Sequence, residues 1–210
     1  RNFGIRDTTV QLVRDSLPID TMGTYRRYFS RPAVVVYSTV NSQKNYIQLN
    51  RGANQGIKDN MAVVNSDGSV VGVVVNVSPN FSQVMSLLHV QSQLNASLKK
   101  TGDVGTVKWE GKDFRYLTLV NIPKSVQLIR GDSVVTSGNN DITFPKGFLV
   151  GTISDIIIDS KTGMYLLKVK AAAKFNNLQQ VHVIENLDRN EQLKLFDETV
   201  KKIEKQKPAK

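Results

Sequence analysis

The sequence predicts an all-β fold made of two small β-barrels, with short helical segments at both ends of the chain. Short runs rich in β-branched residues recur between residues 33 and 184, and turn-forming glycine, asparagine and proline separate them. In addition, one β-hairpin pattern occurs twice. With 210 residues, of which 40% are hydrophobic, the chain has enough apolar side chains to bury a sizeable core.

The duplicated hairpin consists of a charged turn, a Val-Val strand, a loop and a second strand with a glycine near its start. The first copy covers residues 56–75 and the second covers residues 129–153. We interpret the pair as an internal duplication, and two short copies suit barrel halves better than a solenoid. Gly72 and Gly151 occupy equivalent places in the two copies. A branched side chain at either glycine is therefore expected to strain its barrel.

The first 32 residues are interpreted as a linker or as the remnant of a longer N-terminal helix or coiled coil. Val10, Val13 and Leu17 are spaced as one face of a short helix. This helix would end before Pro18, because the residue preceding a proline avoids the helical conformation. The chain begins with arginine and shows no signal peptide, so we expect a fragment of a longer protein.

The strands that follow are divided between two predicted barrels. We expect the two hairpin copies to pair in a discontinuous first barrel of residues 33–78 and 127–186. Residues 79–126 would then form a second barrel inserted between them. One barrel for each hairpin copy is the alternative that the sequence leaves open.

The C-terminal tail of residues 187–210 is basic and contains one amphipathic pattern. A helix over residues 191–205 would carry four apolar side chains on one face: Leu193, Phe196, Val200 and Ile203. Such a helix is marginally stable in water unless that face docks against something.

The formal net charge of +10 favours polyanionic partners, whether nucleic acid or anionic lipid headgroups, without identifying either. Aromatic residues make up only 7% of the chain and are not interleaved with the basic clusters, as stacking on bases would require. Nucleic acid is therefore not expected as a partner, although a polyanion-binding β module remains an alternative function. The chain has no cysteine for disulfides or thiolate metal sites, and no apolar run of about 20 residues that could span a membrane.

The catalytic patterns that a two-barrel β-protein suggests are missing from the sequence. The Gly-Asp-Ser segment at 131–133 invites comparison with a trypsin-like serine hydrolase, but two valines follow where that class has glycines for the oxyanion hole. The only histidines are His89 and His182, and His89 lies in an apolar run that is typical of a structural histidine. Asp132 is expected to be a turn residue that accepts a backbone hydrogen bond. We predict no enzyme activity, no cofactor and no metal, and keep a serine hydrolase as a second alternative.

Several sequence blocks occur in an order that is typical of a known family. They are the turn 49–57 (LNRGANQGI), the strands 70–74 (VVGVV) and 82–88 (SQVMSLL), the blocks 131–138 (GDSVVTSG), 144–147 (FPKG) and 150–153 (VGTI), and the closing segments 171–178 and 181–184. Together, over about residues 33–185, they resemble the extracytoplasmic domain of the MreC family of rod shape-determining proteins. The residues that we assign to a structural signature are Gly56, Gly72, Gly131, Asp132, Thr136, Ser137, Gly138, Pro145, Gly147 and Gly151.

The resemblance implies a non-enzymatic scaffold of the bacterial cell-elongation machinery that organises peptidoglycan synthases. Family members are anchored in the inner membrane by one N-terminal helix, and form dimers or filaments. Outside the membrane they fold into two barrels like those of trypsin-like proteases without the catalytic residues. The implied partners are the class B penicillin-binding transpeptidase of elongation, MreD, MreB and a RodA-type glycosyltransferase. We therefore expect this chain at the extracytoplasmic, periplasmic face of the inner membrane, with its membrane anchor outside the sequence considered.

Six aromatic residues are candidates for protein contacts. Tyr25, Tyr28 and Phe29 lie in the predicted linker and are expected to support self-association. The candidates for partner contact within the barrels are Tyr46, Phe81 and Tyr165. Ordinary packing inside a barrel is the alternative role for each of them.

Overall fold

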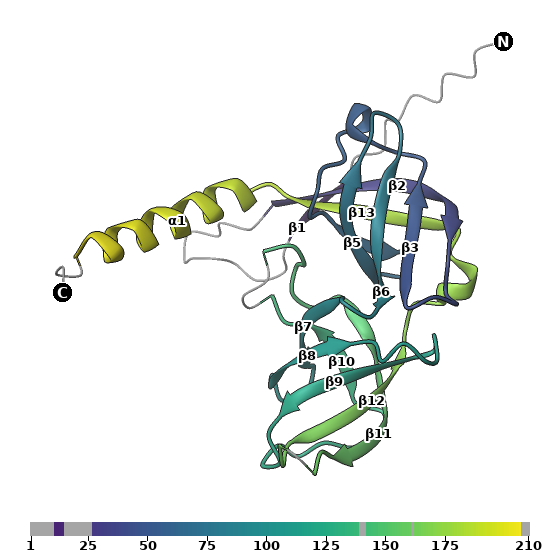
Figure 1. Ribbon diagram of the computed structural model, residues 1–210, viewed down its shortest axis with the longest axis vertical. Helices are drawn as coiled ribbons and strands as arrows, with labels where there is room; N and C mark the ends of the chain where they lie inside the picture. The colour runs from purple at the N-terminus through teal and green to yellow at the C-terminus, as the bar shows by residue number, and fades with distance from the viewer. Residues whose placement is uncertain (1–10, 15–26, 139–141, 161, 207–210) are drawn as a thin grey trace.

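The chain folds into two six-stranded β-barrels and one C-terminal helix (Figure 1). The computed structural model describes residues 11–14, 27–138, 142–160 and 162–206. The strands of the first barrel are β2 (Arg27–Ser38), β3 (Lys44–Leu49), β4 (Ala62–Asn65), β5 (Val70–Val77), β6 (Ser82–His89) and β13 (Gln180–Asn186). Those of the second are β7 (Gln93–Leu98), β8 (Val104–Lys108), β9 (Tyr116–Ile122), β10 (Ser133–Thr136), β11 (Leu149–Ile158) and β12 (Tyr165–Ala171). The predicted all-β double-barrel fold is confirmed.

The two barrels share one topology. When the strands of each barrel are numbered from one to six, both barrels close in the order 1-2-3-6-5-4. The second barrel uses β7 to β12 consecutively, whereas the first uses β13 as its strand one and β2 to β6 as the others. All neighbouring strands are antiparallel. The first barrel therefore closes only when the last strand of the chain returns to it, and closure leaves neither barrel with a free edge.

The predicted barrel boundaries are wrong, although a second barrel is indeed inserted into a discontinuous first one. The insertion runs from β7 to β12 and thus contains the second hairpin copy, which was expected in the first barrel. Residues 79–126 contain only four strands, and β6 pairs with β3 and β5 of the first barrel. The three strands that remain, β7, β8 and β9, cannot close a six-stranded barrel by themselves. Each barrel therefore contains one hairpin copy.

The hairpin duplication is confirmed at the level of strand register. Val63 of β4 pairs with Gly72 of β5, and Val134 of β10 pairs with Gly151 of β11. In both hairpins the register shifts by one residue immediately after this pair, as at a β-bulge. The two copies thus place their glycine and their bulge at the same point of the barrel.

Both glycines lie where the neighbouring strand approaches closely. A Cβ atom at Gly72 would stand 2.2 Å from the carbonyl oxygen of Met85 on β6, and one at Gly151 would stand 2.2 Å from that of Lys170 on β12. The obstacle in each case is backbone, which cannot rotate away. Glycine is required here by the close approach of two strands, and not by an unusual φ angle.

Alternating strand positions fill each barrel with aliphatic side chains. Fully buried examples are Leu49, Val63, Val74 and Leu88 in the first barrel, and Leu119, Val134, Leu167 and Val169 in the second. The single tryptophan, Trp109, is 4% exposed and follows β8. These side chains belong to one continuous apolar cluster, so the two barrels share their packing.

The structure contradicts the helix predicted near the N-terminus and confirms the one predicted near the C-terminus. The predicted helix near the N-terminus is wrong where the structure describes it, because β1 (Gln11–Arg14) is a strand that pairs with the first residues of β2. The predicted C-terminal helix is confirmed as α1 (Arg189–Gln206), which projects away from both barrels (Figure 1). Within the described part of the chain, no helix combines the length and the apolar character needed to cross a bilayer.

Candidate interaction surfaces

Thr136 fixes the loop between β10 and β11, which contains the central part of the signature. Its buried hydroxyl donates to the carbonyl of Pro145 (2.5 Å) and accepts from the amide of Phe148 (2.9 Å). Its own amide donates to the Phe148 carbonyl (2.8 Å), and its carbonyl accepts from the Gly147 amide (3.0 Å). Four hydrogen bonds at one residue thus hold residues 145–148 against the end of β10.

The remaining signature residues of this region also have structural roles. Gly138 (φ 66°) and Gly147 (φ 99°) adopt left-handed backbone conformations that favour glycine. The hydroxyl of Ser137 donates to the carbonyl of Asn95 on β7 (3.2 Å). As expected, Asp132 accepts a backbone hydrogen bond, from the amide of Ile129 to its Oδ2 (2.9 Å).

The loop also connects the second barrel to the first barrel and to α1. Asn186, the last residue of β13, donates through its Nδ2 to the carbonyl of Ile142 (3.0 Å) and to the Oε1 of Gln192 (3.2 Å). A single parallel bridge joins Ser69, just before β5, to Leu149 at the start of β11. The signature loop therefore positions the two barrels and the base of α1 relative to one another.

A cleft of about 410 Å³ lies beside this joint. Its lining is Lys58, Asp59, Asn60, Met61, Thr143, Glu185, Asn186, Leu187, Arg189 and Asn190. Glu185 is 8% exposed and binds Arg31 Nη2 at 2.6 Å and Lys58 Nζ at 2.7 Å. Burial by itself raises the pKa of Glu185, but the hydrogen bonds and positive charges of Lys58 and Arg31 outweigh it and hold the pKa below its usual value. Glu185 is thus an ionised carboxylate whose negative charge is balanced by Arg31 and Lys58.

A second hollow, of about 370 Å³, lies on the second barrel and was not predicted. We call it the Trp109 groove, and it is lined by Trp109, Glu110, Lys112, Asp113, Tyr116, Leu117, Thr118, Ile157, Leu166 and Lys168. Among its lining residues, Ile157 of β11 is 47% exposed and pairs with Leu166 of β12. Ile158 and Met164, which are 53% and 40% exposed at the end of the same strand pair, do not line the groove. The run of three isoleucines at 156–158 was the available signal, because successive residues of a strand point to opposite faces and cannot all face the core.

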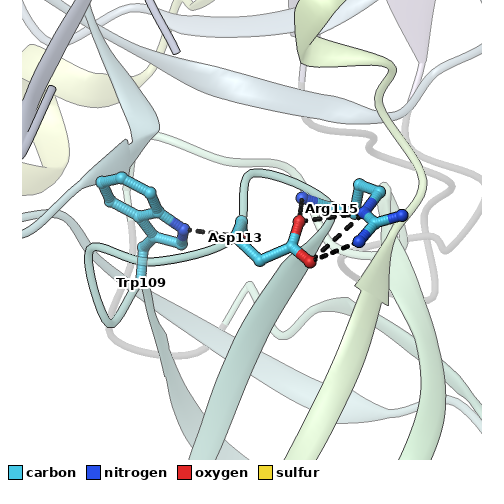
Figure 2. A network of polar contacts seen from close by, with 3 residues as sticks. All are labelled: Trp109, Asp113 and Arg115. Carbon is cyan, nitrogen blue, oxygen red and sulfur yellow. Dashed lines mark hydrogen bonds and ion pairs between the residues drawn. The ribbon is translucent and has the colours of Figure 1, made fainter. Parts of the chain in front are cut away.

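A polar network stiffens one wall of the Trp109 groove (Figure 2). The Nε1 of Trp109 donates to the carbonyl of Asp113 (3.0 Å), and Arg115 binds the Asp113 carboxylate through Nε (3.0 Å) and Nη2 (2.8 Å). The hydrogen bonds from Arg115 lower the pKa of Asp113 to about 2. Beside this network, the ammonium group of Lys168 stands 4.0 Å from the ring centre of Tyr116. The groove therefore has an apolar floor and fixed charges at its rim.

The predicted aromatic candidates that the structure describes lie on β2, β3, β12 and in the turn between β5 and β6. Tyr25 falls outside the described residues, whereas Tyr28 is only 2% exposed and so cannot form the exposed cluster that was expected. Phe29 and Tyr165 are half-buried within strands β2 and β12. Phe81, at 46% exposed, is the candidate among them with a largely accessible side chain.

The two histidines have partners within the first barrel. The ring of Tyr46 packs edge-on against His89, with 5.1 Å between the ring centres and 3.2 Å from its hydroxyl to His89 Nε2. The Nδ1 of His182 lies 2.9 Å from the hydroxyl of Ser30. In the described residues, no three histidine, aspartate or glutamate side chains converge as a metal site would require.

Comparison with known proteins places these features in context. A family model described as rod shape-determining protein MreC, barrel core, matches residues 35–185. The chain is 25% identical, over 177 aligned residues, to the cell shape-determining protein MreC of Haemophilus influenzae. The alignment covers 83% of this chain and 50% of that protein. It thus spans about half the length of the curated relatives that it matches.

Solved structures show the same fold. MreC of Listeria monocytogenes superposes with a TM-score of 0.69 at 24% identity, over 77% of each chain. MreC in a complex with a penicillin-binding protein (PBP2) from Helicobacter pylori superposes with a TM-score of 0.59 at 19% identity, over 76% of this chain and 99% of that one.

Proposed function

Because the chain belongs to the MreC family of rod shape-determining proteins through its barrel core, we propose that it is a non-enzymatic scaffold of the bacterial cell-elongation machinery. Such a protein acts by presenting surfaces that hold peptidoglycan synthases together. The observation that carries the proposal is the family match itself, which extends over both barrels. The polar residues of the signature support it, since they are used in hydrogen bonds that position the loop and the barrels.

The partner that we propose first is the class B penicillin-binding transpeptidase of elongation. A solved relative with the same fold was determined in complex with a penicillin-binding protein. In this chain we propose the Trp109 groove as the contact surface, because the exposed Ile157 and the half-buried Leu166 that line it offer apolar area that a partner could bury. The charged rim, with Lys112 and Asp113 among its residues, would then select the orientation of the partner.

The wider assembly follows the same reasoning. We propose self-association, together with association with MreD, MreB and a RodA-type glycosyltransferase, at the periplasmic face of the inner membrane. Membrane attachment would come from a segment outside this sequence. The aromatic residues between 25 and 29 are not proposed as the self-association surface, because Tyr28 is buried.

Binding to the extracellular part of the cognate transpeptidase tests the proposal. We expect saturable binding that persists at high salt, because burial of apolar surface is insensitive to ionic screening. Ile157→Ser should weaken binding about tenfold, since truncating a central apolar contact removes on the order of 1–2 kcal/mol. Val104→Ser, at a similarly exposed valine (41%) of the same barrel, is the matched control and should have no effect.

The charge of the chain defines the competing function, a polyanion-binding module. If the net charge of +10 were responsible, binding to the transpeptidase would vanish at high salt and the chain would bind heparin instead. Equal weakening by Ile157→Ser and Val104→Ser would remove the Trp109 groove as the contact surface.

A further inference from the structure

Helix α1 exposes an apolar stripe that the barrels do not cover. Phe196 is 66% exposed, Ile203 is 56% exposed and Val200 is 37% exposed. The helix projects away from both barrels, and the bond between Asn186 and Gln192 ties down its first turn (Figure 1). A helix of 18 residues without tertiary packing is marginal in water, so this stripe needs a covering surface.

The spacing of the stripe identifies the kind of surface. Leu193, Phe196, Val200 and Ile203 recur at intervals of three, four and three residues. This is the alternation of positions a and d in a heptad repeat, which forms the seam of a coiled coil. The face away from the stripe is charged, and Lys194 lies 4.0 Å from Glu198 there. The helix is therefore built to pair with one other helix along a narrow seam.

The residues that flank the seam fit a second copy of the same helix in parallel. With Leu193 at position a, Gln192 is at position g and Asp197 is at position e. A parallel pair brings g of one helix beside the next e of its partner, so Gln192 meets the partner's Asp197. An antiparallel pair would place the two Asp197 carboxylates opposite each other. The Oε1 of Gln192 already accepts from Asn186, which leaves its amide nitrogen to donate to the carboxylate.

The same charge pattern disfavours a membrane surface as the covering partner. Helices that lie on anionic bilayers carry lysine along the borders of their apolar face. In α1, Lys194, Lys201 and Lys202 lie on the face away from the stripe, and Asp197 borders it. Anionic headgroups would meet a carboxylate at that border.

We propose that two copies of this chain pair through α1 in a parallel, in-register, two-stranded coiled coil. The pairing is symmetric, because the same stripe is used on both copies. It places the first barrel of one copy and the first barrel of the other at the same end of the helix pair. This proposal rests on the self-association part of the proposed function and supplies its surface.

Sedimentation of the 210-residue chain over a range of concentrations tests the pairing. Phe196→Ser should weaken dimerisation about tenfold or more, because it removes the largest side chain of the seam. Leu195→Ser is the matched control, since Leu195 is equally exposed (66%) but lies outside the seam. A chain that stays monomeric at all concentrations, or equal effects of the two variants, would overturn the proposal.

Cross-linking tests the orientation of the two helices. The chain has no cysteine, so Ile203→Cys introduces a single thiol. In the parallel pair this thiol lies opposite its own copy, and oxidation should give a disulfide-linked dimer. In an antiparallel pair, residue 203 lies opposite residue 193, so absence of the cross-link in a dimer excludes the parallel arrangement. Leu195→Cys should not cross-link.

Two further measurements separate this inference from the proposed function and from a membrane role. Phe196→Ser should retain transpeptidase binding, so loss of dimerisation alone leaves the scaffold function untouched. Flotation with vesicles of anionic phospholipid should recover little of the wild-type chain. If much of the wild-type chain floated with the vesicles and Phe196→Ser abolished this, the stripe would bind lipid, and the pairing would be overturned.

Discussion

Gly151 carries no side chain, and at the residue scale this absence is what allows β11 and β12 to pair. A Cβ atom there would stand 2.2 Å from the Lys170 carbonyl oxygen. We expect Gly151→Val to lower the free energy of unfolding by about 1–3 kcal/mol, because the backbone itself must move. Thr152→Val, which places the same β-branched side chain on the next residue, should leave stability nearly unchanged. Thermal unfolding of the two variants provides the measurement, and equal melting temperatures would contradict the strand register described above.

His89 gives a pH dependence at the same scale. Burial, and secondarily the charge of Lys44, lower the pKa of His89 below its usual 6.5. Its Nδ1 accepts a hydrogen bond from the Gln91 amide (3.1 Å), so the folded protein holds the neutral ring. As the pH falls below about 6.5, His89 becomes protonated in the unfolded state but stays neutral in the folded state. The free energy of unfolding therefore decreases until the pH reaches the pKa of His89 in the folded state.

Denaturant unfolding at pH 7.5 and pH 5.5 measures this effect. We expect the wild-type chain to be less stable at the lower pH. In His89→Gln the difference should shrink, because that side chain does not titrate in this range. Glu185 does not interfere, since its pKa is held below 4.5 and its contribution to stability is lost only as the pH falls below that value. An unchanged pH dependence in His89→Gln would assign the effect to another group.

At the scale of elements, the loop between β10 and β11 and helix α1 show two ways to stabilise a segment. The loop has its partners inside the chain, where Thr136 alone accounts for four hydrogen bonds. Helix α1 has its apolar stripe in solvent, so its stability depends on a second molecule. The Phe196→Ser and Leu195→Ser comparison belongs to this scale, because it asks whether an element is complete by itself.

At the scale of the whole molecule, the shared topology of the barrels predicts unequal independence. The second barrel takes all six strands from residues 93–171, whereas the first needs β13 from residues 180–186. A fragment of residues 91–173 should therefore fold and unfold cooperatively, with the fluorescence of Trp109 as the probe. A fragment of residues 27–91 should not, because without β13 it leaves two strand edges unpaired.

Both outcomes are informative. A folded fragment of residues 27–91 would mean that β13 is dispensable for the first barrel. An unfolded fragment of residues 91–173 would mean that the contacts across the joint, such as the bond from Asn186 to Ile142, are needed to hold the second barrel together.

The sequence by itself determined the fold class, the repeated hairpin and the helical stripe, because these depend on local periodicity and on residue types. The alignment of the two hairpin copies predicted that Gly72 and Gly151 occupy equivalent places, and the strand register confirms this. The aromatic candidates were less informative. Tyr28 looks exposed in a linker by its sequence context, yet it is buried in β2.

Only the tertiary structure decided which strands share a barrel, and where the Trp109 groove lies. Strand pairing joins residues far apart in the chain, as when β13 closes the barrel that β2 begins, and no local pattern encodes that choice. The groove likewise arises where β9, β11 and β12 meet, from side chains such as Tyr116, Ile157 and Leu166. The pattern of residues along the chain determines what each strand is, whereas closure of the barrels determines which of its side chains reach the surface together.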